Sequence, residues 1–234
     1  PAEGCTPQPW KQRIFTAGVW KIMKFYVSST KAWAPGIENG IDAIQNEKAS
    51  PKIEFTDPLF RRRFSQITKM TVQVVHDVIE EVPEAKDFKI VFVSFRGEIE
   101  REFAIDKMVI EDGMILPAAF SLSVFNTPIA AATIALGLKG GYSCIYPSQG
   151  NFRDALISAA SSVLCGDEKK ILFVYADEKI PAEYESTLKN YNTPGIPVPL
   201  SFACILSAEE TEGSREFSMD FLEATPVDFL KKVI

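Results

Sequence analysis

The sequence contains a single histidine, His76, and this scarcity excludes more kinds of function than any other count. Sites that pair a serine or cysteine with histidine, and metal sites built from several histidines, have only this residue to use. The four cysteines lie far apart, with no Cys-x-x-Cys pair. We therefore expect no metal and no cofactor, and we interpret Cys144 and Cys165 as buried, reduced structural thiols of a cytoplasmic protein.

Other absences narrow the function further. No run approaches about 18 uninterrupted apolar residues, so we expect no membrane span. Among 234 residues the net charge is −6, and the only concentrated basic run is Arg61–Arg63, which disfavours nucleic-acid binding. The phosphate-binding patterns G-x-G-x-x-G and G-x-x-x-x-G-K-[ST] are missing, as is the nucleophile elbow G-x-S-x-G.

What remains is an ordinary globular composition, with 46% hydrophobic and 24% charged residues. Residues 1–22 hold scattered prolines and charges but no apolar signal core. Because Met23 directly precedes a strand-like segment, we interpret 1–22 as a disordered upstream or expression-derived segment. We expect a single domain over residues 23–234.

Apolar patterning predicts alternating strands and helices in that domain. Strands are expected at 24–29, 89–95, 142–146 and 171–176, with a closing pair at 201–206 and 215–221. Helices are expected at 65–81, 97–112, 128–136, 152–164 and from Pro226, and loops at 117–126 and 180–199. The small side chains of 152–164 favour a helix packed on several sides. The alternation is typical of a layered α/β domain.

The only histidine lies on the wrong side of its helix for a core role. Ile67, Met70, Val74 and Val78 recur at helical spacing, which places His76 on the opposite, solvated face. We favour a surface histidine without a catalytic role.

One strand–turn–helix segment, 142–164, has the form that presents a nucleophile at a helix N-terminus. Its turn offers only Ser148, Gln149 and Asn151. Glutamine has neither a titratable proton nor nucleophilic power, so the turn lacks the chemistry for covalent catalysis.

The order of these segments resembles the N-terminal half of the β-ketoacyl synthases. The resemblance rests on the run 117–126, the small-residue helix that follows, strand 142–146, the turn at 147–151 and helix 152–164. The segments 64–70 and 175–178 fit the family on either side, so that the similarity covers roughly residues 23–209. It implies a thiolase-like half, a layered α/β sheet with a buried central helix.

The resemblance also implies what is missing. Active synthases carry an acyl-accepting cysteine at the turn, where this chain has Gln149, and two histidines in a C-terminal half that we expect this short chain to lack. A homologue with glutamine there is the chain length factor of type II polyketide systems, and related proteins occur in aryl polyene clusters. The alternative is that Gln149 is a capping residue in an unrelated α/β domain.

The resemblance therefore implies a non-catalytic, chain-length-factor-like subunit. It would form a heterodimer with an active β-ketoacyl synthase, stabilise it and shape the acyl tunnel in aryl polyene or polyketide biosynthesis, a pathway related to fatty acid biosynthesis. The run Arg61–Arg63 is complementary to an acidic acyl carrier protein, or is simply a solvated helix start. The expected interface or tunnel residues are Phe120, Phe125, Asn126, Ile129, Ser148, Gln149 and Phe152.

Two other functions stay open at this point. One is an autonomous condensing enzyme or acyltransferase that uses Ser148 or a cysteine with His76 as base. The other is a binding module for a carrier protein or small molecule, without a ketosynthase partner. Because a half-fold leaves a sheet edge or apolar face uncovered, we expect the chain to self-associate when it is expressed alone.

Overall fold

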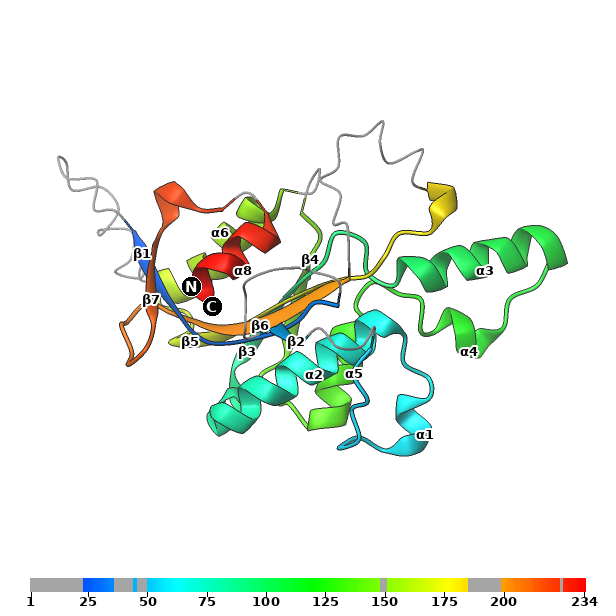
Figure 1. Ribbon diagram of the computed structural model, residues 1–234, viewed down its shortest axis with the longest axis horizontal. Coiled ribbons are helices and arrows are strands. Elements are labelled where there is room, and N and C mark those ends of the chain that lie inside the picture. The colour runs from blue at the N-terminus through cyan, green and yellow to red at the C-terminus, as the bar shows by residue number, and fades with distance from the viewer. Residues whose placement is uncertain (1–22, 36–43, 46–49, 148–150, 185–198, 224) are drawn as a thin grey trace, which may run out of the picture.

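A mixed β-sheet forms the centre of the computed structural model, which describes residues 23–35, 44–45, 50–147, 151–184, 199–223 and 225–234 (Figure 1). In these residues the strands are β1 (Lys24–Trp33), β2 (Ile44–Gln45), β3 (Lys89–Val93), β4 (Tyr142–Ile145), β5 (Lys170–Asp177), β6 (Leu200–Ser207) and β7 (Arg215–Ser218). Their order is β2-β1-β6-β5-β3-β4, with β7 also paired to β1. Strands β3, β4 and β5 are parallel, and β6 runs antiparallel to both of its neighbours.

The central strands bury both of their faces. All eight residues of β6 and seven of the eight in β5 are buried. Successive side chains of a strand point to opposite faces, so Phe173 and Tyr175 enter one hydrophobic core while Leu172 and Val174 enter the other. Near-continuous apolar strands of this kind need a cover on each face.

Helices supply that cover and make a three-layer α/β structure. They are α1 (Pro58–Arg61), α2 (Gln66–Glu81), α3 (Ile99–Asp112), α4 (Pro117–Phe120), α5 (Thr127–Leu136), α6 (Phe152–Leu164) and α8 (Pro226–Val233), with 3₁₀ turns at Pro83–Asp87 and Met219–Phe221. Helices α6 and α8 lie on one face of the sheet, and α2 and α5 lie on the other (Figure 1). Among the described residues, no helix is both long and apolar enough to cross a membrane.

The two longest sheet-covering helices are enclosed to different degrees. Helix α2 begins where predicted, with the hydroxyl of Ser65 accepting a hydrogen bond from the Thr68 amide at 3.2 Å, and nine of its residues are buried. Helix α6 matches its predicted bounds, but Arg153, Asp154 and Ser158 are exposed. The helix predicted to pack on several sides thus has one open side, and α2 is the more enclosed of the two.

Two details of the predicted topology were wrong. Strands β6 and β7 do not pair with each other, because β1 lies between them and pairs with both. The ten-residue length of β1 allows this, since β7 pairs with only its first four residues. The expected loop at 117–126 also contains the short helix α4, which begins with a proline that favours the first helical turn.

One segment of the chain projects from the sheet and its covering helices, which together we call the body. Residues 99–124, which we call the arm, comprise α3, α4 and the turn after it, and project at one end of the molecule (Figure 1). Gly113 ends α3 with a left-handed backbone (φ 67°), as predicted for a glycine cap. Only Ile105 of the fourteen α3 residues is buried. The arm is therefore not part of the core.

Candidate functional site

The polar residues of the body gather where the parallel strands end. Ser94, Phe95 and Arg96 follow β3, Tyr146 follows β4, and Glu178 follows β5. Because β3, β4 and β5 are parallel, these ends meet at one edge of the sheet. Open α/β sheets bind their ligands beyond this edge, so the candidate site lies here.

Asp177, the last residue of β5, links the end of β5 to the turn after β3 by hydrogen bonds. Its carboxylate is fully buried and accepts hydrogen bonds from the Ser94 hydroxyl (2.9 Å), the Tyr175 hydroxyl (2.6 Å) and the amides of Phe95 (3.0 Å) and Arg96 (3.1 Å). Burial raises the pKa of Asp177, and the hydrogen bonds from Tyr175, Phe95 and Ser94, together with the charge of Arg96, oppose the rise. The network fixes the turn after β3, and both carboxylate oxygens are satisfied within it.

A pair of buried acidic residues joins the arm to the body. Glu98 and Glu178 are each 1% exposed. Glu98 Oε1 accepts hydrogen bonds from the hydroxyls of Ser65 (2.7 Å) and Thr68 (2.5 Å), and Glu178 Oε1 accepts one from the Glu100 amide (3.1 Å). Burial, and then the charge of Glu98, raise the pKa of Glu178 to about 8. Glu178 is therefore mostly protonated at neutral pH.

Above this edge, the arm and the strand ends enclose a pocket of about 600 Å³. Gly97 allows Phe125, one of the lining residues, to approach the backbone closely: the φ of Gly97 is 60°, and a Cβ there would lie 2.9 Å from Cδ2 of Phe125. Phe125 in turn packs edge-on against Phe92 and Tyr146. The lining residues are Phe95, Arg96, Ile99, Glu102, Phe120, Ser123, Val124, Phe125 and Tyr146.

The structure brings together some of the residues proposed from the sequence. Phe120 and Phe125 both line the pocket. Asn126 lies beside it at the start of α5, where its side-chain amide donates a hydrogen bond to the Tyr142 hydroxyl at 2.9 Å. Ser148 and Gln149 lie outside the described residues.

The other two proposed residues lie in the interior. Ile129 is fully buried in the core on the α2 side of the sheet. Phe152 is fully buried on the other side, where it packs against the aromatic rings of Phe173, Tyr175, Phe202 and Phe229. Both fill the core of this chain, so neither presents surface to a partner here.

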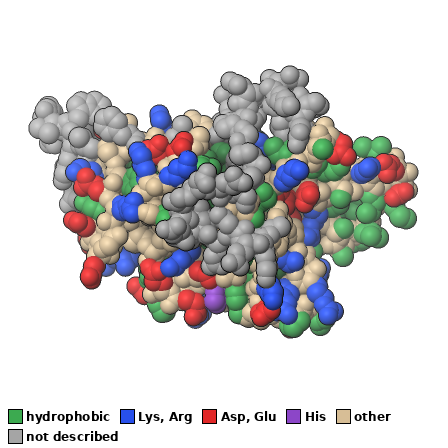
Figure 2. Space-filling model, viewed as in Figure 1, with side chains coloured by type: hydrophobic (Ala, Val, Ile, Leu, Met, Phe, Trp, Pro, Cys, Tyr) green, Lys and Arg blue, Asp and Glu red, His purple; other side chains and the backbone are tan. Residues whose placement is uncertain are grey.

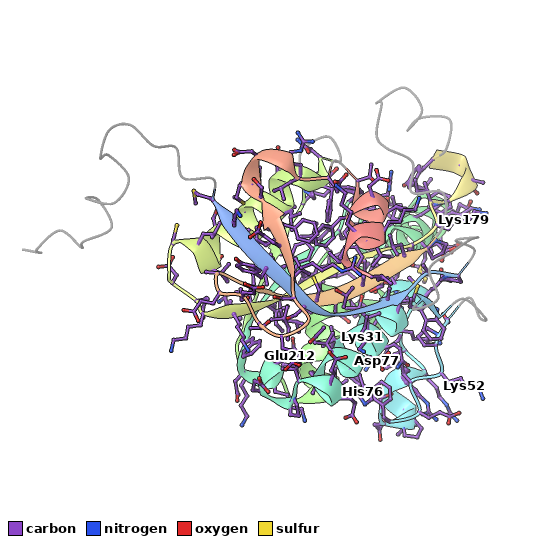
Figure 3. All side chains as sticks on the ribbon, turned by 60° about the vertical axis from the view of Figure 1, so that its left-hand side comes forward. Lys31, Lys52, His76, Asp77, Lys179 and Glu212 are labelled. Carbon is purple, nitrogen blue, oxygen red and sulfur yellow. The ribbon has the colours of Figure 1, made fainter. Side chains whose placement is uncertain are left out.

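His76 is partly buried, with 23% of its side chain exposed. Its ring stacks on Phe55 with centroids 3.6 Å apart, and its nitrogens lie 3.3 Å from Asp77 and 3.8 Å from Glu80. His76 and Asp77 are neighbours on α2 (Figure 3). In the described residues, the polar contacts of the ring are thus with carboxylates rather than with a nucleophile.

The cysteines differ from one another. Burial raises the pKa of the Cys144 thiol to about 11, and it also raises the pKa of Cys204, which is fully buried in β6. The expectation that Cys165 is buried was wrong: it caps the last turn of α6 at the surface. Across the part of the chain that the structure describes, no three His, Cys, Asp or Glu side chains gather as a metal site.

The acidic residues of this edge and Arg96 were not singled out from the sequence. A signal was present, because Asp177 and Glu178 directly follow a buried strand and Arg96 and Glu98 follow another. Polar residues at the carboxyl ends of parallel strands are candidates for a shared site.

Comparison with known proteins agrees with this architecture. A family model described as "Beta-ketoacyl synthase, N-terminal domain" matches residues 31–227. The chain belongs to this family. The resemblance seen in the sequence is thereby confirmed, and so is the α/β, thiolase-like fold class.

Solved structures share the fold of this family member at low sequence identity. A chain from a ketosynthase in complex with its chain length factor, from Xenorhabdus doucetiae, is 22% identical, with a TM-score of 0.60 and 77% of each chain covered. A chain from a type II polyketide acyl carrier protein in complex with its ketosynthase is 14% identical, with a TM-score of 0.57, 80% of this chain and 64% of that one covered.

A third structure, the ishigamide ketosynthase/chain length factor, is 14% identical, with a TM-score of 0.51. The match covers 66% of this chain but only 46% of that one. The match thus spans less than two thirds of the length of the ishigamide chain and of the chain from the acyl carrier protein complex. No curated protein sequence matches it.

Proposed function

We propose that this chain is a non-catalytic, chain-length-factor-like subunit that pairs with an active β-ketoacyl synthase. The observation that carries the pairing is the exposed apolar surface of the arm. Its large exposed hydrophobic residues are Val109, Ile110, Met114, Ile115, Leu116, Phe120 and Val124. Hydrophobic side chains gather at this end of the molecule (Figure 2). Contiguous apolar surface of this kind marks a protein interface.

A ketosynthase is the partner that fits this surface best. The relative from Xenorhabdus doucetiae is described as a ketosynthase in complex with its chain length factor, and this chain shares that fold. Strand β4 ends the sheet next to the arm's return into α5, and no strand of the described residues pairs with its outer side. Such an edge, beside an apolar arm, gives a partner both backbone hydrogen bonds and hydrophobic contacts.

The absence of catalysis in this subunit is argued from the sequence at the turn before α6. Gln149 stands where active family members carry the nucleophile, and glutamine does not form an acyl-enzyme. The high pKa of Cys144 and the contacts of His76 with carboxylates supply no replacement pair. The role left for the pocket under the arm is to wall the tunnel of the growing acyl chain, in aryl polyene or related polyketide biosynthesis.

An acyl carrier protein is the second partner of this proposal. Arg62 and Arg63 are exposed, and the Arg101 guanidinium donates a hydrogen bond to the Arg63 carbonyl at 3.0 Å. The basic run therefore lies at the base of the arm, where an acidic carrier protein could deliver its chain.

The pairing is tested by co-purifying the chain with a ketosynthase encoded nearby, read by gel filtration with light scattering. We expect a stable heteromer, and we expect Ile110→Glu to weaken it at least about tenfold because a charge enters an apolar interface. Ile134→Glu is the matched control, since Ile134 on α5 is 71% exposed and Ile110 is 82% exposed. Equal pairing of the two variants, or a chain that never pairs, would contradict the proposal.

The non-catalytic role is tested in the same complex. Condensation should stop when the partner's own active-site cysteine is replaced, and Gln149→Ala should leave acyl transfer to the partner intact. An acyl group covalently attached to this chain alone, detected by mass spectrometry, would overturn the role and favour an autonomous acyltransferase.

A further inference from the structure

The pocket under the arm combines an apolar wall with one buried cation. Phe95, Phe125 and Tyr146 come from the sheet side, and Phe120 and Val124 from the arm. Its volume of about 600 Å³ lies in the range of small-molecule sites. Arg96 is the only Lys or Arg among its described lining residues.

Within the part of the chain that the structure describes, the guanidinium of Arg96 has no hydrogen-bond partner. Its three nitrogens each expose less than 1 Å². Its main chain is held firmly, because the Arg96 amide donates to Asp177 and to the Ser94 hydroxyl. The charge of Arg96 lowers the pKa of buried Asp177, but no hydrogen bond joins the guanidinium to that carboxylate, which already accepts four others. A buried charged group whose hydrogen bonds are unmade destabilises the folded state, and a ligand that supplies acceptors to the guanidinium would remove that cost.

We infer that this pocket binds an apolar carboxylate whose charged end pairs with Arg96. This inference rests on the proposed function, in which the pocket is part of the acyl tunnel. It adds that the ligand carries a negative charge. A planar guanidinium pairs with a carboxylate through two parallel hydrogen bonds. The aromatic wall accepts the ligand's hydrocarbon part, as apolar surface removed from water favours binding.

A carboxylate fits better than a phosphate group. A single guanidinium balances one negative charge, whereas phosphate sites usually combine several donors or cations. Glu102 also lines the pocket, but it is exposed, so that solvent and salt screen its repulsion.

The ligand reaches Arg96 by displacing side chains of the arm. Phe120 and Val124 are 55% and 44% exposed, and Ile105 is the one buried residue of α3. The hydrogen bonds between α3 and the body lie in its first turn, where the Glu100 amide donates to Glu178 and Arg101 donates to the Arg63 carbonyl. The side chains of the arm are therefore the part of the pocket wall that moves when a ligand enters. A bound ligand should then reduce the motion of the arm.

The test uses the full chain with octanoate as the probe and octanamide as its neutral counterpart, by isothermal titration calorimetry. We expect saturable binding of one octanoate per chain, at least about tenfold tighter than octanamide, because only the acid pairs with a guanidinium. Arg96→Met should remove this preference and leave octanamide binding unchanged. Octanoate should also slow amide hydrogen exchange in residues 99–124.

Arg62→Met is the matched control, because it removes one exposed positive charge away from the pocket lining. It should bind octanoate as the unmodified chain does. Should Arg96→Met fail to fold, Arg96→Lys replaces it, because lysine keeps the charge but cannot form the bidentate pair. In Arg96→Lys the ratio of octanoate affinity to octanamide affinity should fall several-fold. Equal binding of acid and amide by the unmodified chain, or a preference for octanoate that is undiminished in Arg96→Met or in Arg96→Lys, would overturn the inference.

Ketosynthase pairing, measured by light scattering on the same preparations, separates the two proposals. A chain that pairs but shows no acid preference refutes the carboxylate site alone. A chain that prefers octanoate but never pairs refutes the subunit role and leaves the binding site standing.

Discussion

The body and the arm of this chain bury their apolar residues in opposite ways. In the body, every residue of β6 is buried and helices cover both faces of the sheet. In the arm, Ile105 is the only buried residue of α3, while Ile110 and Leu116 are more than half exposed. The body has thus completed its core within the chain, whereas the described residues of the chain leave the apolar surface of the arm uncovered.

The junction between the two regions is polar. Glu98 and Glu178 bind groups of α2 and the first turn of α3, and Asp177 fixes the turn after β3. Hydrogen bonds to buried carboxylates are directional, so they set the arm's angle without enclosing it. An arm oriented in this way is suited to docking.

The largest expected effect lies in the body. Phe152→Ala removes a fully buried ring that packs on four other aromatic side chains, and should lower the free energy of unfolding by about 3–5 kcal/mol. Phe120→Ala in the arm, where the ring is 55% exposed, should lower it by less than about 1 kcal/mol. Urea unfolding of both variants measures the contrast, and equal losses would place the arm inside the cooperative core.

An intermediate effect is expected at the junction, and it depends on pH. The pKa of Glu178 rises from 4.5 unfolded to about 8 folded, so the folded state binds more protons between these values. Its contribution to stability is complete below the unfolded pKa and declines as the pH rises toward 8, by up to about 1.4 kcal/mol per pH unit. Glu178→Gln, which stays neutral, should flatten this decline in urea unfolding measured from pH 5 to pH 8.

Exposed Glu183 provides the control for that measurement. Glu183→Gln should keep the pH dependence of the unmodified chain. If Glu178→Gln declines as steeply as the unmodified chain does, Glu178 does not carry the buried proton.

The smallest effect on stability should come from the tip of the arm. Ile110→Ser changes a side chain that is 82% exposed, so the free energy of unfolding should stay within about 0.5 kcal/mol. The same variant should reduce self-association of the lone chain, as judged by sedimentation velocity at several concentrations. Unchanged self-association would mean that another surface, such as the β4 edge, is responsible.

Local sequence signals located most elements correctly. Ser65 caps α2, Gly113 ends α3, and the bounds of α6 agree with the apolar pattern. These features depend on neighbours within a few residues, which a single sequence displays directly. The pairing of β7 with β1 was missed because it joins segments about 190 residues apart, as the contact of Tyr26 with Glu216 shows.

The candidate site was predicted only in part for the same reason. Phe120 and Phe125, which were proposed from one short segment with a recognisable family pattern, line the pocket, and their role as interface or tunnel residues stays a prediction. Ile129 and Phe152 belong to that pattern too, but their burial on opposite faces of the sheet depends on the packing of α5 and α6. Whether an apolar residue lines a pocket or fills a core is decided by what packs on it.

The sequence by itself determined the family, the alternation of strands and helices, and the lack of a cysteine at the turn before α6. It did so because apolar period, capping residues and residue identity are properties of the chain alone. Only the tertiary structure decided that Glu98 and Glu178 share one buried junction, that the Arg96 guanidinium has no hydrogen bond among the described residues, and that the arm stands apart from the core. Those outcomes depend on burial, and burial arises when segments distant in sequence pack together.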